Sequence, residues 1–285
     1  MGPALPQELA HAPALLIDAH VHLHDCYHPQ RFLENAADNF EHAAREHGWN
    51  PASPGVLLLT ESAGVDWFGR LAAEAAGASD LALGSWALEA TPDPSALLAR
   101  SGTRRLLLVS GRQVVTREGL EVLLLATRGT VPDRLPIREV LAEGERLGAL
   151  RVIPWGAGKW LFGRGRLLSE LIEAARPGGG FFLGDSAGRP GFWASPRHFG
   201  AAARRGIKVL PGTDPLPFPD EATRPGSYGF RLEPTGDLAR PAEGIKAALV
   251  RPDARLTPFG RLERLGPFVR HQLAMQRRKR RSAAP

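Results

Sequence analysis

Eight short runs of Val, Ile and Leu recur along the 285 residues, and they constrain the fold more than any other feature. Runs that are continuous rather than alternating indicate strands buried on both faces, as in parallel sheets. The predicted strands cover residues 15–20, 56–60, 83–90, 105–111, 121–127, 150–156, 180–186 and 207–214. The predicted helices between them cover residues 29–47, 64–77, 137–148, 162–176 and 196–205.

Strands that alternate with helices predict an α/β fold, and eight of them in a chain of this length describe a (β/α) TIM-like barrel. A doubly wound sheet is the alternative. Residues 112–120 are too few for a crossover helix, because a parallel crossover needs a dozen or more residues. That connection is therefore a short helical turn or part of a hairpin. We expect a distorted barrel, with seven strands as an alternative to eight.

No linker or internal repeat divides the chain, so residues 1–285 are predicted to form one barrel domain. From about residue 257 the pattern becomes amphipathic, with Leu265, Val269 and Leu273 at helical spacing after Leu262. We expect this C-terminal helix to pack on the barrel and to end in a basic tail.

Charge is concentrated in that tail. Arg277–Arg281 is a run of five cations and accounts for all but +1 of the net charge of +6. Such a tail either binds nucleic acid or an anionic membrane surface, or is a solvated helix end. Because the body is nearly neutral and carries no aromatic-rich nucleic-acid motif, nucleic acid is not an expected partner except through the tail.

The remaining composition is typical of a soluble protein, with 43% hydrophobic and 23% charged residues. Cys26 is the only cysteine, so an internal disulfide is excluded and a reducing, cytoplasmic location is expected. The N-terminus does not resemble a signal peptide, and no apolar run is long enough to span a bilayer. The sequence is compatible with both a monomer and a homo-oligomer.

The segment IDAHVHLH, residues 17–24, ends the first predicted strand. Residues i and i+2 of a strand face the same side, so His20 and His22 can hold one cation between neutral imidazoles. A lone histidine is more often a core or surface residue, but His24 continues the alternation. We interpret the pair as metal ligands.

Charged residues follow most of the other predicted strands. The chemistry of such barrels lies at the C-terminal ends of strands, where charge is seldom needed for packing. These positions hold Glu61, Glu89, Arg112, Lys159, Asp185, Arg189 and Asp214.

Each candidate has a plainer interpretation. Asp214, before Pro215, is either a metal ligand and proton acceptor or a turn residue. Asp185 is either a metal ligand or an ordinary loop residue. Lys159 follows a glycine but fails the phosphate-loop pattern, because Trp160 stands where Ser or Thr is required. Lys159 is therefore either an anion-binding lysine or an ordinary surface lysine. Arg189 either binds a carboxylate or phosphate with its guanidinium group, or is an ordinary loop residue.

IDAHVHLH resembles the first-strand His-x-His motif of the amidohydrolase superfamily and of the related PHP (polymerase and histidinol phosphatase) hydrolases. GTDPLP, residues 212–217, is similar to the last-strand Asp segment of amidohydrolases. Gly119-Leu120-Glu121 is similar to the segment in which PHP proteins place a metal-binding Glu. The resemblance implies His20, His22, Asp214 and Glu121 as ligands. Those families also supply histidines from later strands, and only His198 and His271 follow His47 here.

We therefore expect one divalent metal, Zn first and Mn or Fe as alternatives, held by His20, His22, Asp214 and further carboxylates, Asp185 or Glu121. The metal would activate a water to hydrolyse an amide, lactone or phosphoester bond, with Asp214 taking the proton. Lys159, Arg189 and Arg112 would bind a small anionic substrate. Two alternatives remain: a decayed barrel that only binds an anionic metabolite or partner, and a metal-free lyase that uses Lys159.

Overall fold

The computed structural model describes residue 9 and residues 11–282 with three gaps, at 177–179, 193–194 and 235–237. Its strands are β1 (Leu15–Val21), β2 (Gly55–Leu59), β3 (Ala87–Ala90), β4 (Ala96–Ser101), β5 (Arg104–Val109), β6 (Gly111–Val115), β7 (Glu121–Leu125), β8 (Leu150–Pro154), β9 (Phe182–Ser186), β10 (Val209–Gly212), β11 (Tyr228–Leu232) and β12 (Leu256–Gly260). Its helices are α2 (Pro29–Glu46), α3 (Trp67–Ala75), α4 (Ile137–Arg146), α5 (Phe162–Ala174), α6 (Arg197–Arg204), the 3₁₀ helix η1 (Pro219–Thr223), α7 (Pro241–Val250) and α8 (Leu265–Ser282).

The strands form two open mixed sheets, so the prediction of a TIM barrel, closed or distorted to seven strands, is wrong. One sheet has the order β12-β11-β1-β2-β5-β4-β3 and the other the order β10-β9-β8-β7-β6. The reason lies in short connections. Only residues 102–103 join β4 to β5, and only residue 110 joins β5 to β6, so no crossover helix fits there. The structure is nevertheless α/β, as predicted.

All of the unpredicted strands, β4, β6, β11 and β12, pair antiparallel with their neighbours. Residues 112–120, too short for a crossover, form the greater part of the β6–β7 hairpin, which is antiparallel. Strand β4 pairs antiparallel with both β3 and β5, and β11 pairs antiparallel with β1 and β12. Residues 222–230, beyond the last predicted strand, hold the end of η1 and the start of β11.

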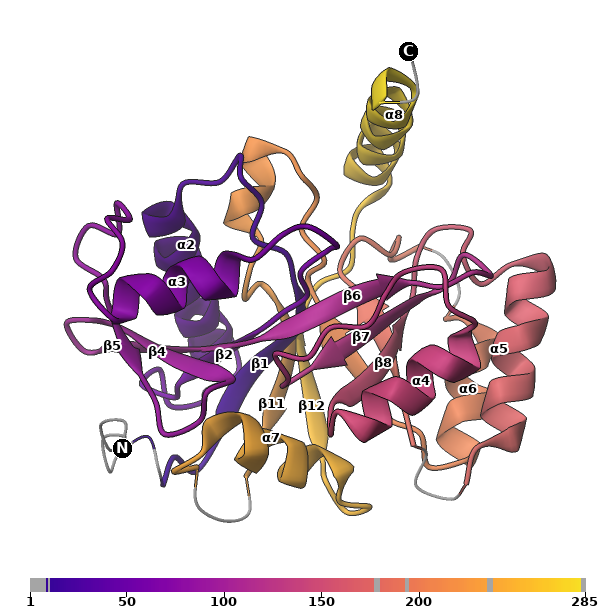
Figure 1. The fold of residues 1–285 in the computed structure, drawn as a ribbon, viewed down its shortest axis with the longest axis horizontal. Coiled ribbons are helices and arrows are strands. Elements are labelled where there is room, and N and C mark those ends of the chain that lie inside the picture. The colour runs from indigo at the N-terminus through magenta and orange to yellow at the C-terminus, as the bar shows by residue number, and fades with distance from the viewer. Residues whose placement is uncertain (1–8, 10, 177–179, 193–194, 235–237, 283–285) are drawn as a thin grey trace.

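The two sheets face one another across an inner core, with helices outside (Figure 1). Ile17 and Val56 of the first sheet share that core with Leu123 and Val152 of the second, and α7 closes one end of it through Ile245. Alternate residues of the same strands face outward, where α2 and α3 cover the first sheet and α4, α5 and α6 the second. The layers thus follow the order helix, sheet, sheet, helix.

Helix α8 stands away from the body (Figure 1). Leu265, Val269 and Leu273 are 58%, 46% and 48% exposed, so the predicted packing of this face on the body is wrong. The side chains of the basic tail, Arg277–Arg281, lie outside the described residues. Among the helices that the structure describes, none is long and apolar enough to cross a membrane.

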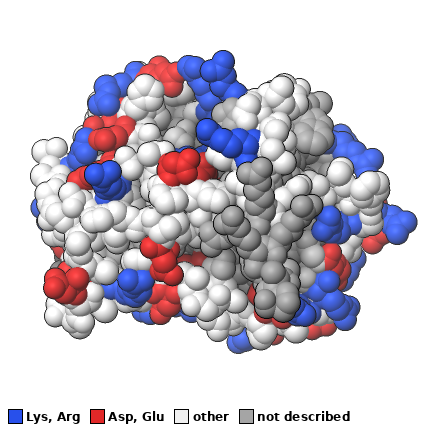
Figure 2. Space-filling model, turned by 90° about the horizontal axis from the view of Figure 1, so that it is seen from above, with Lys and Arg blue, Asp and Glu red and all other residues white. Residues whose placement is uncertain are grey.

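Both signs of charge are interspersed around the face seen from above, and no field of one sign covers it (Figure 2).

Candidate metal centre

Strand β1 carries the first two site residues, and a bulge re-aims its end. Its register with β2 runs regularly to Asp18↔Leu57 and then shifts to Val21↔Leu59, so β1 holds one extra residue there. In consequence Ala19 packs in the inner core whereas Val21 packs outward. His20 lies within the bulge and His22 directly follows the strand, and both are buried.

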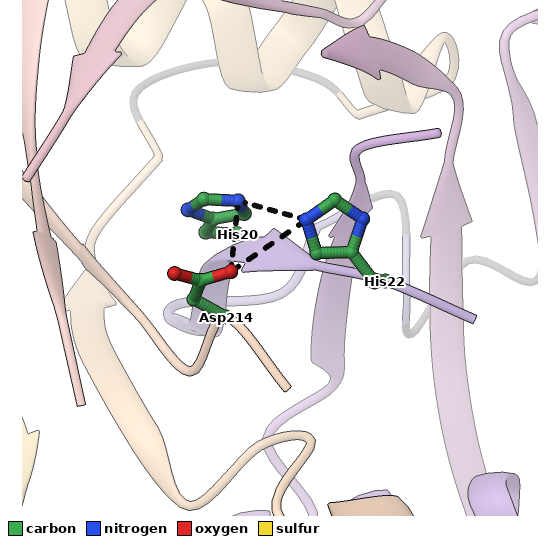
Figure 3. Close-up of side chains that lie close together, drawn as sticks. All are labelled: His20, His22 and Asp214. Carbon is green, nitrogen blue, oxygen red and sulfur yellow. Dashed lines mark hydrogen bonds and ion pairs between the residues drawn. The ribbon is translucent and has the colours of Figure 1, made fainter. Parts of the chain in front are cut away.

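His20, His22 and Asp214 converge, as the close-up shows (Figure 3). The two Nε2 atoms are 3.1 Å apart. The Oδ1 atom of Asp214 lies 3.4 Å from Nε2 of His20 and 3.6 Å from Nε2 of His22. Among the described residues this is the one group of three or more His, Cys, Asp or Glu side chains whose ligand atoms all fall within 4.8 Å of one another. It brings together three of the five predicted metal ligands.

The approach of β10 to β1 positions Asp214. A Cβ at Gly212 would lie 2.4 Å from the backbone N of His20, so only glycine permits this close contact. Asp214 then donates its backbone N–H to the carbonyl of His20 at 2.7 Å and adopts a left-handed φ of 50°, which Asp tolerates better than most residues. The carboxylate is 28% exposed and so remains accessible to a ligand.

Asp18 fixes this arrangement from behind. Its fully buried carboxylate accepts hydrogen bonds from the backbone N–H and the hydroxyl of Thr213, at 2.8 and 2.5 Å, and from the N–H of Gly226 at 2.9 Å. Burial raises the pKa of Asp18 to about 7, against these hydrogen bonds. Asp18 was not among the predicted site residues, although it belongs to the IDAHVHLH segment. A buried acid two residues before a metal-type histidine is the signal that could have found it.

Both imidazoles are neutral at neutral pH. Burial lowers the pKa of His20 to about 4 and that of His22 to about 3, and the negative charge of Glu121 only partly opposes this. Desolvation also raises the pKa of Asp214, which His22 partly counteracts. A neutral imidazole can offer the lone pair that a cation needs.

Glu121 and Lys159 lie beside the cluster as an ion pair. Burial would raise the pKa of Glu121, but Lys159 outweighs it, aided by both histidines, and the pKa lies below its usual value. Glu121 begins β7, which runs antiparallel to β8, so its start lies at the same edge as the end of β8 and its neighbour β9. Gln113 of β6, which sequence analysis left without a role, hydrogen-bonds the His20 ring.

The other predicted site residues are engaged elsewhere. Asp185 lies outside the three-residue group, and its carboxylate receives Nε and Nη2 of Arg189 at 2.7 and 2.8 Å. The hydroxyl of Tyr228 donates to the same carboxylate at 2.7 Å. Arg112 contacts the buried Glu61 at 3.5 Å and donates to the carbonyl of Val65. Glu89 pairs with Arg100 on β3 and β4, at the edge of the first sheet.

Comparison with known proteins finds similarity only in structure. No protein-family model and no curated sequence matches the chain. The crystal structure of PsfC from Pseudomonas syringae PB-5123 is similar with a TM-score of 0.53 and 13% identity, over 95% of this chain and 99% of PsfC. A structure of Endonuclease Q with a 27-mer duplex substrate bearing an abasic lesion has a TM-score of 0.43 and 15% identity, over 83% of this chain and 56% of that protein. At these identities the likeness to PsfC shows the fold alone. The weaker likeness to Endonuclease Q supports no argument.

Proposed function

We propose that this protein is a metal-dependent hydrolase of the amidohydrolase or PHP type. It would hold a single divalent cation, with Zn²⁺ the first candidate, through His20, His22 and Asp214. The observation that carries the proposal is the convergence of two neutral imidazole nitrogens and one carboxylate oxygen in a buried site.

The spacing of these atoms supports a tetrahedral ion. Ligands about 2.0–2.1 Å from Zn²⁺ in tetrahedral geometry lie about 3.3 Å from one another. The three distances here are 3.1, 3.4 and 3.6 Å. A catalytic zinc uses three protein ligands and keeps the fourth position for water or substrate. The donor set fits that pattern, and Mn²⁺ or Fe²⁺ are alternatives with the same ligands.

The surrounding residues fit hydrolysis of a small anionic substrate. A bound divalent cation would lower the pKa of water toward 7 and polarise the bond under attack. Asp214 is partly exposed, and among the described residues its Oδ2 accepts one long hydrogen bond, from the hydroxyl of Ser186 at 3.4 Å, so this oxygen can take a proton. Lys159 is 32% exposed and places a positive charge near the cluster, where it can hold a carboxylate or phosphate. The bond cleaved would be an amide, a lactone or a phosphoester.

Arg112 and Arg189 are now weaker candidates for substrate binding. Each is already paired with a carboxylate, and Arg189 is bound in bidentate fashion. Lys159 is also paired, with Glu121, but its side chain is 32% exposed, against 21% for Arg112 and 9% for Arg189. Lys159 is therefore the principal candidate for binding the anion.

Metal loading tests the proposal. Purified protein would be stripped with a chelator, reloaded with Zn²⁺, Mn²⁺ or Fe²⁺, dialysed and measured for metal content and for turnover of p-nitrophenyl acetate and p-nitrophenyl phosphate. We expect one equivalent of metal and metal-dependent turnover for the wild type, and neither for the double variant His20→Gln/His22→Gln. His42→Gln removes an exposed imidazole of α2 and should load normally.

Two outcomes contradict parts of the proposal. Stoichiometric metal in the double variant would place the ion elsewhere. One equivalent of metal without turnover of p-nitrophenyl acetate or p-nitrophenyl phosphate would favour a binding protein over a hydrolase.

A further inference from the structure

A cavity opens among the loops that follow β8 and β9. It is a cavity of about 370 Å³, within the range of small-molecule sites. The loop after β8 supplies Trp155, Trp160 and Leu161, the first residue of α5 supplies Phe162, and Arg189 and Arg197 come from the following β-α connection and α6. Its wall is thus mainly aromatic and aliphatic, with two guanidinium groups.

The apolar rim of this cavity is held open at a conformational cost. Phe162 is 91% exposed and Leu161 is 48% exposed, although both are large apolar residues. Phe162 also adopts a left-handed φ of 54°, which is strained for a bulky side chain. Exposure and strain at the same residue are typical of positions maintained for binding rather than for stability.

Trp160 adds an unsatisfied donor. Its side chain is 5% exposed and its indole Nε1–H has no hydrogen-bond partner among the described residues. A buried donor without a partner costs about 1–3 kcal/mol. The Nε1 atom itself is buried, so the donor does not face the cavity, and its cost falls on the stability of this loop.

The cavity adjoins the metal centre through two connections. Lys159 lies within the same loop and reaches Glu121, whose charge acts on both histidines. On the other side Arg189 holds Asp185, and the next residue, Ser186, hydrogen-bonds Asp214. Both sets of contacts connect the wall of the cavity to the metal centre.

We propose that this cavity binds an aromatic ring of the substrate, next to an anionic group held by Lys159. The proposal rests on the proposed function, since it names the substrate class of the same site as aromatic esters, amides or phosphoesters. The flat indole and phenyl walls favour a ring over an alkyl chain, because aromatic pairs gain energy beyond their buried area.

Binding to metal-free protein tests the cavity independently of catalysis. With a chelator present, the dissociation constants of 1-naphthyl phosphate, octyl phosphate and inorganic phosphate would be measured by calorimetry. We expect 1-naphthyl phosphate to bind at least tenfold more tightly than either of the others. The double variant Leu161→Ala/Phe162→Gly should bind 1-naphthyl phosphate about tenfold more weakly, with no change for the other two compounds. The variant should fold, because glycine is suited to the left-handed φ at position 162.

Val250→Ala trims an apolar residue that is 57% exposed at the end of α7 and should bind as the wild type does. His20→Gln/His22→Gln should still bind 1-naphthyl phosphate more tightly than octyl phosphate. If the metal assay fails while this difference in affinity is kept, the hydrolase proposal is rejected and the cavity proposal stands. Equal binding of naphthyl and octyl phosphate would overturn the assignment to aromatic rings. An unchanged naphthyl affinity in Leu161→Ala/Phe162→Gly would overturn the cavity itself.

Discussion

Two buried clusters in this protein combine histidine with carboxylate, and they differ in whether a cation is already present. In one, His271 lies 3.4 Å from Glu221 and 3.0 Å from Glu263, and Arg224 contacts the same two carboxylates at 3.3 and 2.9 Å. In the other, His20 and His22 meet Asp214 while the nearby lysine is bound to Glu121. The guanidinium completes the first cluster. The second presents three ligand atoms around a point that no described side-chain cation fills.

This difference separates a structural cluster from a candidate site. Buried carboxylates are costly unless a cation and hydrogen bonds compensate them. The Arg224 cluster meets that requirement within the chain and ties the base of α8 to η1. The His20 cluster has its imidazoles in the neutral form, so a cation from outside is the natural complement.

Removing the built-in cation should have the largest effect on stability. Arg224→Met would leave Glu221 and Glu263 buried without it, and breaking such a group costs about 3–5 kcal/mol. We expect the melting temperature to fall by on the order of 10 °C. Calorimetry checks this, with Arg261→Met as the control, because Arg261 is 85% exposed and pairs with Glu46 at the surface. A loss no larger than that of the control would remove the contrast between the two clusters.

Acidification should act on the other cluster. The pKa of His20 lies near 4 in the folded protein, below the ordinary value of 6.5, so the unfolded chain takes up the proton first as the pH falls. Stability from this group is present above pH 6.5 and is lost as the pH falls toward 4. At pH 5 the loss is about 2 kcal/mol.

Denaturant unfolding of metal-free protein at pH 7.5 and pH 5 measures that loss. His20→Gln cannot take up the proton, so its stability should fall by about 2 kcal/mol less than that of the wild type between these pH values. Identical pH dependence in both proteins would mean that His20 is not held in its neutral form.

The smallest expected effect concerns the support of a ligand. Gln113 hydrogen-bonds His20, and residues that orient a metal-bound imidazole typically contribute 10–100-fold in affinity. Gln113→Leu should weaken Zn²⁺ binding about tenfold, measured by competition with a chromogenic chelator. Unchanged affinity would mean that β1 and β10 alone orient the histidines.

The local pattern of the sequence predicted the residues that converge in the candidate site better than it predicted the fold. Alternation in IDAHVHLH brought out His20 and His22, and an acid at the end of the predicted strand 207–214 brought out Asp214, because both signals depend on a few adjacent residues. The barrel was wrong because buried antiparallel strands and buried parallel strands look alike as apolar runs. Residues 105–111 were predicted as one strand, but β5 ends at Val109 and β6 begins at Gly111 in the other sheet.

Side-chain pairing was the part that the sequence could not provide. Asp185 and Arg189 were predicted for different roles, but four residues apart they satisfy one another. Glu121 became a candidate site residue only through the resemblance to PHP proteins. A search for charged residues at the C-terminal ends of strands misses it, because Glu121 begins an antiparallel strand. Which charges neutralise each other depends on distances between strands far apart in the chain.

The hydrogen bonds of Asp18 have a consequence for how the protein matures. They join β1 to Thr213 across 195 residues of sequence, so the site exists only after both sheets have assembled. Contacts of such long range form late in folding, because the intervening chain must first be ordered. A nascent chain would therefore expose His20 and His22 during most of its synthesis without the carboxylate that completes the set. An ion acquired at the end would then close the loop of 194 residues between His20 and Asp214, and chelation would loosen both sheets together.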